Sequence, residues 1–164
     1  MGRLMEYLLI ITLVFITDLV VKTVIEKKRK LGEQDRLFHG KVIIQKYYNK
    51  GFALDKFEKY PKLVSYGSAA VTVILLVKLI VLLFQKGYKG LKIALSFIIG
   101  GACSNIFDRF TKHYVVDYIS FDVKWEKLRK IVFNLSDFFI IVGTLLMVIS
   151  KKPGSEKKRK SAQK

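Results

Sequence analysis

Four apolar blocks constrain the fold of this 164-residue chain more than any other feature. They occupy residues 5–25, 63–84, 91–107 and 131–150, to within a residue or two. Each is close to the roughly 20 residues that an α-helix needs to cross about 30 Å of hydrocarbon. The sequence therefore predicts an all-α integral membrane protein, with four transmembrane helices in one membrane domain spanning 1–164.

The composition excludes two other classes of protein. The formal net charge is +17, yet 51% of the residues are hydrophobic. Such hydrophobicity argues against an intrinsically disordered chain. Long apolar blocks argue against a soluble protein that binds nucleic acid. We expect membrane lipids, and not nucleic acid, among the partners.

The first block could also be a cleavable signal peptide, because Arg3 precedes it. Asp18 and Lys22 interrupt its far half, however, and no cleavage site of small residues follows. Retention as a helix is therefore favoured. The third block is the richest in small residues, which predicts a helix in the middle of the bundle.

The connections between the blocks differ in length and character. Residues 26–62 and 108–130 are long and polar, and each contains a segment typical of a strand, at 41–48 and 114–121. A small sheet on one membrane face follows from this pattern. The tail, 151–164, is rich in Lys and Arg. Counts of basic residues leave the orientation in the membrane undecided.

Ionisable residues at membrane depth are candidates for function, because a charge in hydrocarbon is costly unless it is paired. Asp18 and Lys22 lie four residues apart on one helical face, and a structural ion pair is favoured over direct chemistry. Asn105, Asp108 and Arg109 also share one face. They could form either a staple at the helix end or the wall of a polar pocket.

Two carboxylates can meet at the rim of the bilayer. Asp137 lies near the start of the fourth block, three residues after Asn134, and Asp117 lies on the strand that leads back to the membrane. Paired carboxylates can share one proton and so activate water in an aspartic protease. They could equally couple protons in a transporter. His39 and His113 are too far apart in sequence to suggest a metal site.

Five motifs then follow one another along the chain. They are DLVVK at 18–22 (D-x-x-x-K), NKGFA at 49–53 (N-x-G-x-A), GGACSNIFDR at 100–109 (G-G-x-x-G-N-x-x-D-R), VVDY at 115–118 (V-V-D-[FY]) and FNLSD at 133–137 (F-N-x-A-D). In this order they resemble the motifs of lipoprotein signal peptidase, or signal peptidase II, a family of bacterial membrane aspartic proteases. Ser104, Ser136, Phe52 and Leu54 depart from the family pattern, with Ser104 replacing a glycine and Ser136 an alanine.

The resemblance implies roles for particular residues. Asp117 and Asp137 would form the catalytic dyad, while Asp18 and Lys22 would support the helix bundle. Substrate would be bound by a polar set in which Asp108 holds Arg109: Asn49, Gly51, Asn105, Asp108, Arg109 and Asn134. The resemblance implies no cofactor and no metal.

The resemblance also implies a substrate and a location. The enzyme would cut prolipoproteins on the amino side of a diacylglyceryl-modified cysteine, in the bacterial plasma membrane. Both termini would be cytoplasmic, with the active site and a small β-cradle on the extracytoplasmic face. We expect a monomer. The alternatives are a four-helix transporter or channel that uses the carboxylates for proton or cation coupling, and a noncatalytic assembly factor.

Overall fold

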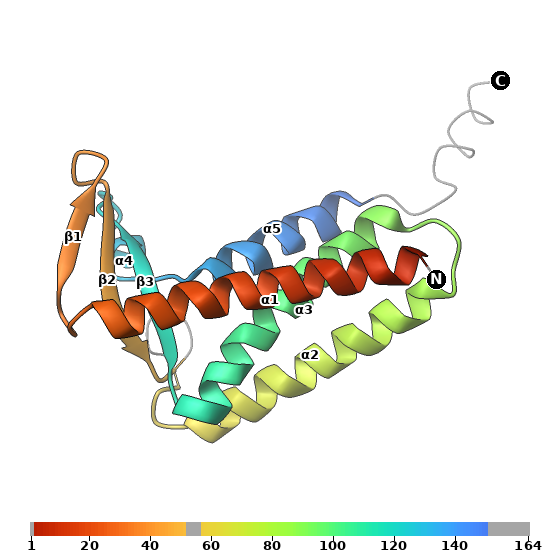
Figure 1. Ribbon diagram of the computed structural model, residues 1–164, viewed down its shortest axis with the longest axis horizontal. Helices are drawn as coiled ribbons and strands as arrows, with labels where there is room; N and C mark the ends of the chain where they lie inside the picture. Colours follow the sequence, from red (N-terminus) through yellow and green to blue (C-terminus); the bar gives the residue numbers. More distant parts are fainter. Residues whose placement is uncertain (1, 52–56, 151–164) are drawn as a thin grey trace.

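The computed structural model describes residues 2–51 and 57–150, and in these ranges it contains five helices and three strands. The elements in chain order are α1 (Gly2–Lys28), β1 (Gln34–Leu37), β2 (Val42–Asn49), α2 (Pro61–Leu83), α3 (Lys89–Lys112), β3 (Val115–Phe121), α4 (Glu126–Arg129) and α5 (Leu135–Ile149). The four longer helices lie beside one another, and the sheet with α4 lies at one end of them (Figure 1). The N-terminal end of α1 and the last turn of α5 lie at the opposite end.

Helix α3 is the centre of the bundle, as its small residues predict. It packs against α1, α2 and α5, and it is more buried than α1 or α2. Gly100 faces α1, and a Cβ there would lie 2.9 Å from the backbone oxygen of Ile11. Gly101 faces α5, and a Cβ there would lie 2.7 Å from the backbone oxygen of Ser136. The two glycines therefore allow three helix backbones to approach closely.

The prediction of a mostly helical membrane protein with a small sheet is confirmed, whereas the count of four spans is not. Within the described residues, three helices are long and apolar enough to cross a membrane: α1, α2 and α3. Helix α5 is apolar but has 15 residues, about 22 Å at a rise of about 1.5 Å per residue. It starts at Leu135 rather than near 131 because Asn134 caps it. The preceding Phe133 pairs with Ile119 as an extension of the sheet.

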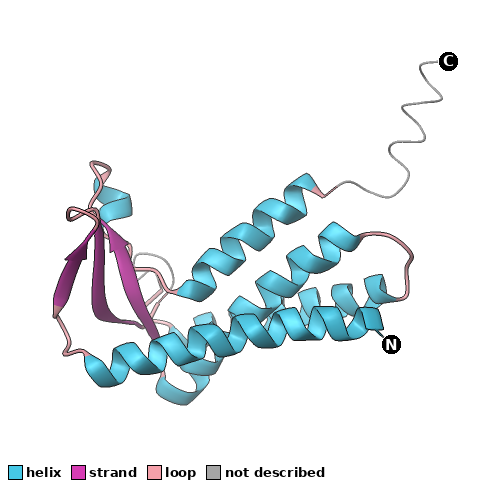
Figure 2. Cartoon of the chain, turned by 45° about the horizontal axis from the view of Figure 1, so that its top comes forward, coloured by secondary structure: helices cyan, strands magenta, loops and turns pink. Residues whose placement is uncertain are grey.

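The three strands form an antiparallel sheet in the order β1-β2-β3 (Figure 2). Strands β2 and β3 agree with the predicted segments at 41–48 and 114–121. Strand β1, with the sequence QDRL, was not predicted, because every residue in it is exposed and it shows no apolar alternation. Phe52, Ala53, Leu54 and the tail at 151–164 lie outside the described residues.

A bulge in β2 sets which side chains face the bundle beside Asp117. Ile44 pairs with Ile119, but Tyr47 pairs with Asp117. Between these two pairs β2 advances by three residues and β3 by two, so β2 contains one extra residue. Because side chains alternate along a strand, this extra residue reverses which face each later residue of β2 occupies. Asn49, instead of Tyr48, then shares a face with Asp117.

The close contact between α3 and α5 leads to a prediction about stability. A Cβ at Gly143 would lie 2.7 Å from the backbone oxygen of Ala94. Gly143→Ala should therefore push the two helices apart and lower the free energy of unfolding by about 1–3 kcal/mol. Thermal unfolding in detergent micelles measures this. The matched control is Gly67→Ala in α2, where a Cβ would meet no atom within 4 Å. Equal stability of the two variants would contradict the close packing.

Candidate active site

Asp117 and Asp137 both line one cavity of about 650 Å³. Asp117 lies on β3 with only 2% of its surface exposed, and Asp137 lies in the first turn of α5. The two acids therefore come from the end of the sheet and the end of the bundle, where these meet. The structure brings together the two carboxylates that the resemblance implies as a pair.

Asn134 joins the two carboxylates. Its side-chain Nδ2 donates to Asp117 Oδ1 at 2.7 Å, and its backbone N–H donates to Asp137 Oδ2 at 2.9 Å. In return, its Oδ1 accepts from the backbone N–H of Asp137 at 3.1 Å. This reciprocal capping box fixes the first turn of α5, and with it the direction of the Asp137 side chain.

Two further asparagines donate to the remaining carboxylate oxygens. Asn49 Nδ2 donates to Asp117 Oδ2 at 2.9 Å, which the bulge in β2 makes possible. Asn105 Nδ2 donates to Asp137 Oδ1 at 3.1 Å. Every oxygen of the pair thus has one amide donor, and a carboxylate oxygen has a second lone pair free to face the cavity.

Burial changes the acidity of Asp117. Removal from water, and then the negative charge of Asp137, raise the pKa of Asp117 from about 3.8 to about 7, although the amides of Asn49 and Asn134 oppose the rise. Both effects disfavour the ionised carboxyl group. The pair can consequently hold one proton near neutral pH, which is the state that carboxylate-pair chemistry needs.

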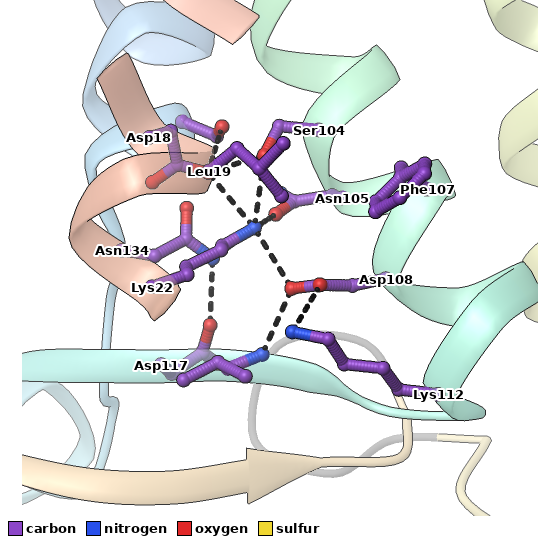
Figure 3. Close-up of polar contacts among 12 residues, drawn as sticks. Asp18, Leu19, Lys22, Ser104, Asn105, Phe107, Asp108, Lys112, Asp117 and Asn134 are labelled. Atoms are coloured by element: carbon purple, nitrogen blue, oxygen red, sulfur yellow. Dashed lines mark hydrogen bonds and ion pairs between the residues drawn. The ribbon is translucent and has the colours of Figure 1, made fainter. Parts of the chain in front are cut away.

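Beside Asp117, the ammonium group of Lys22 joins several buried polar and charged side chains (Figure 3). Lys22 Nζ lies 2.8 Å from Asp18 Oδ2 and 3.2 Å from Asp108 Oδ2, and all three side chains are fully buried. It also donates to Asn105 Oδ1 at 2.7 Å. Because that bond holds the amide oxygen of Asn105, the Nδ2 group of Asn105 faces Asp137. Lys22 therefore links the network of charges to the candidate active site.

Asp108 is placed differently from the implied role of holding Arg109. In the part of the chain that the structure describes, its ion pairs are with Lys22 and Lys112, the latter at 3.0 Å. Its Oδ2 also accepts from the backbone N–H of Val116 at 3.2 Å. Asp108 is fully buried and is not among the residues that line the cavity. Of the two alternatives left by the sequence, a staple at the helix end or the wall of a polar pocket, Asp108 fits the staple.

Arg109 instead turns to the loop after β2. Its Nη2 donates to the backbone oxygen of Gly51 at 3.3 Å, and the residue lines the cavity. The backbone N–H of Gly51 donates to Asn49 Oδ1 at 3.0 Å, so these three residues form one connected group. Arg109 therefore fits the other alternative, because it forms part of the wall of the polar pocket.

The rest of the cavity wall is mainly apolar. It is built from α2, α3, α5 and the segment before α5, with side chains that include Leu63, Val71, Ile98, Phe133 and Ile140. Five of its polar residues gather around the two acids, Asn49, Asn105, Arg109, Asp117 and Asp137, and two more, Ser68 and Thr72, lie on α2. The site thus combines a polar end with an apolar wall, which suits a substrate that has both a peptide and an apolar portion.

Sequence reasoning missed three hydroxyl groups beside the site, those of Ser104, Tyr118 and Ser136. All three bond to Asp18. Ser104 and Ser136 are visible in the sequence as departures from the family pattern, but not as partners of Asp18. For metals, the described residues contain no group of three or more His, Cys, Asp or Glu side chains placed to hold an ion.

Comparison with known proteins gives a consistent set of relatives. A family model described as signal peptidase (SPase) II matches residues 10–151. A lipoprotein signal peptidase from Caldicellulosiruptor bescii is 34% identical over 154 residues, which cover 93% of this chain and 95% of that protein. One from Clostridium tetani is 33% identical over 142 residues, covering 87% and 89%.

A third relative and one solved structure extend the comparison. A lipoprotein signal peptidase from Serratia marcescens is 37% identical over 109 residues, but the match covers only 66% of this chain and 63% of that protein. A solved structure of a bacterial membrane enzyme superposes with a TM-score of 0.75 at 24% identity, covering 97% of this chain and 92% of that one. The solved structure shows that the fold is shared.

The buried ion pairs of Lys22 with Asp18 and Asp108 lead to a second prediction about stability. Lys22→Met would leave Asp18 buried without its counter-ion, and it would remove one of the two cations beside Asp108. Removal of one partner from a buried pair costs about 3–5 kcal/mol. Denaturant unfolding in micelles should show a loss of this size.

The control for this variant is an ion pair at the surface. Arg36→Met breaks the pair with Asp122, whose side chains are 59% and 39% exposed, so it should cost less than about 1 kcal/mol. Similar losses in the two variants would show that the Lys22 network does not hold the bundle together.

Proposed function

The chain belongs to the signal peptidase II family and removes signal peptides from prolipoproteins, and we propose that it does so as an aspartic endopeptidase with Asp117 and Asp137 as its catalytic pair. Family membership does not support the transporter or channel alternative. The catalytic type and the roles of individual residues are our proposal.

One observation carries the proposal. Two buried carboxyl groups line the same cavity, and a single residue, Asn134, bonds to both. A purely structural role would favour a cation between the two acids. Here each carboxylate oxygen instead receives a neutral amide donor, so the repulsion between the acids remains available to retain a proton.

The chemistry follows from that shared proton. The ionised member of the pair removes a proton from a water molecule in the cavity, and the protonated member donates to the oxygen of the scissile carbonyl. The resulting tetrahedral gem-diol collapses when the carboxyl group that took the proton from water passes it to the leaving amine, while one hydroxyl of the gem-diol returns a proton to the other carboxylate. The asparagine amides keep both carboxyl groups in place throughout.

The other polar residues of the cavity would hold the peptide. Arg109 presents a guanidinium group and Asn49 an amide at the edge of the cavity. These groups can bind backbone carbonyls of an extended substrate. Gly51, whose backbone oxygen accepts from Arg109, would fix the position of the guanidinium group. Asp108 would not contact the substrate. It would instead hold Lys22 and the backbone of β3 in place.

The apolar wall supports a lipid-modified substrate. We propose that a diacylglyceryl-modified cysteine places its acyl chains along α2 and α5, where Leu63, Val71 and Ile140 line the cavity. Its peptide then lies across the carboxyl pair, with cleavage on the amino side of the cysteine.

The arrangement of the elements supports an orientation in a bacterial plasma membrane. We propose that α5, together with the extended residues 131–134, makes a fourth crossing. The sheet and α4 would lie on the extracytoplasmic face, and both termini would be cytoplasmic. The exposed apolar side chains of α1, α2 and α5 would face lipid.

Replacement of either acid tests the catalytic pair. Asp117→Asn and Asp137→Asn should each lower kcat by about 10²–10⁴-fold, because an amide can neither accept nor donate the proton. The measurement is cleavage of a diacylglyceryl-modified prolipoprotein by purified enzyme in micelles. The matched control is Asp122→Asn, an exposed aspartate at the same end of the molecule, which should leave kcat within about twofold.

The outcome that contradicts this assignment is clear. Cleavage that survives at wild-type rates in either variant would remove that aspartate from the mechanism. Thermal unfolding of each variant shows whether a loss of activity comes from misfolding.

The pH dependence of cleavage is a separate prediction. The pair holds one proton below an apparent pKa of about 7, and above it both groups ionise, so the general acid is lost. The value of kcat/KM should therefore fall about tenfold per pH unit above that value. It is measured with a substrate that carries no group titrating in this range. A rate that keeps rising into alkaline solution would contradict the shared proton.

A further inference from the structure

The carboxylate of Asp18 is bonded to four donors from four elements. Its Oδ2 accepts from Ser104 Oγ at 2.6 Å, from Ser136 Oγ at 2.5 Å and from Lys22 Nζ at 2.8 Å. Its Oδ1 accepts from Tyr118 Oη at 3.3 Å. A carboxylate offers about four lone-pair sites, and four donors meet at this one. Asp18 is also fully buried, and it is not among the residues that line the cavity.

Each of the three hydroxyl groups belongs to a residue next to a member of the site. Ser104 precedes Asn105 on α3, Tyr118 follows Asp117 on β3, and Ser136 precedes Asp137 on α5. These residues lie 86, 100 and 118 positions from Asp18 in sequence, yet its one carboxylate on α1 bonds to all of them. The close-up shows the Asp18, Ser104 and Lys22 part of this cluster beside Asn105 (Figure 3).

Tyr118 also holds the helix that carries Asp137. Its hydroxyl oxygen accepts from the backbone N–H of Leu135 at 3.0 Å while its proton points to Asp18. The first N–H groups of a helix have no partner within the helix, so this bond satisfies one of them. With the Asn134 cap and the Ser136 bond, the first turn of α5 is fixed at three points.

On the premise of the proposed function, we propose that Ser104, Tyr118 and Ser136 are positioning residues, which act through the shared carboxylate of Asp18 to set the relative positions of Asn105, Asp117 and Asp137. They touch neither substrate nor the reacting atoms. Ser104 and Ser136 stand where the family pattern has glycine and alanine, which lack a hydroxyl group. In this chain, therefore, three hydroxyl groups bond Asp18 to the segments that carry Asn105, Asp117 and Asp137.

Kinetics of hydroxyl deletions test this proposal. The variants are Tyr118→Phe, which removes one oxygen, and the double variant Ser104→Ala/Ser136→Ala. A misplacement of about 1 Å at an active site can cost roughly 100-fold, so kcat should fall by about 10- to 100-fold in the double variant, with KM within about threefold. The assay uses intact enzyme in micelles and a diacylglyceryl-modified prolipoprotein, well below the temperature of unfolding.

A matched control separates positioning from packing. Ser96 is fully buried on α3, but its hydroxyl donates to the backbone oxygen of Lys92 in its own helix at 2.9 Å. Ser96→Ala should leave kcat within about twofold. A double-mutant cycle on kcat gives a coupling between the two serines that a loss of packing alone would not produce. The effects on kcat of Ser104→Ala and Ser136→Ala should be non-additive, because both act on one carboxylate.

The outcomes distinguish this proposal from the proposed function. If Asp117→Asn abolishes cleavage but Tyr118→Phe and the double serine variant keep wild-type kcat, the positioning role is wrong and the catalytic pair stands. Additive effects that follow the loss of thermal stability also overturn it. If Asp117→Asn and Asp137→Asn both retain cleavage, the catalytic pair itself is wrong.

Discussion

The position of Lys22 governs how this bundle can assemble. Its ammonium group is fully buried, 2.8 Å from Asp18 and 3.2 Å from Asp108. An unpaired charge at such a site costs several kcal/mol, so α1 and α3 can associate only in the register that brings these groups together. Asp108 then bonds to the backbone of β3, and Asp18 bonds to α3, β3 and α5. The sheet and the helix that carry the two acids are thus held to the same pair of helices.

Much of the fold could be predicted from local patterns. Apolar length located α1, α2 and α3, small residues placed α3 in the centre, and β-branched and aromatic residues located β2 and β3. The start of α5 could not be found by apolar content, because Ile131 to Phe133 are as apolar as the helix itself. The three-residue spacing of Asn134 and Asp137 is that of a capping box, which apolar content does not reveal. Strand β1 is polar and depends on its pairing with β2 for its conformation.

The site was harder to predict, because its geometry depends on contacts between distant segments. The residues alone indicate a carboxylate-lined polar site, and only the ordered motifs point to Asp117 and Asp137 as a pair. The resemblance implies that Asp108 holds Arg109. Asp108 instead pairs with Lys22, and Arg109 bonds to Gly51. No local pattern shows the bulge that brings Asn49 to Asp117, nor the three hydroxyl groups that meet at Asp18.

Infrared spectroscopy can test directly whether the two acids share one proton in the buried cavity. The measurement is a titration of the carboxylic C=O stretching band of the purified protein in micelles, with the Asp117→Asn/Asp137→Asn double variant as reference. We expect a band from one protonated carboxyl group that disappears as Asp117, whose pKa is raised to about 7, ionises, and that is absent from the reference. A pair whose two carboxyl groups are both ionised already in mildly acidic solution would contradict it.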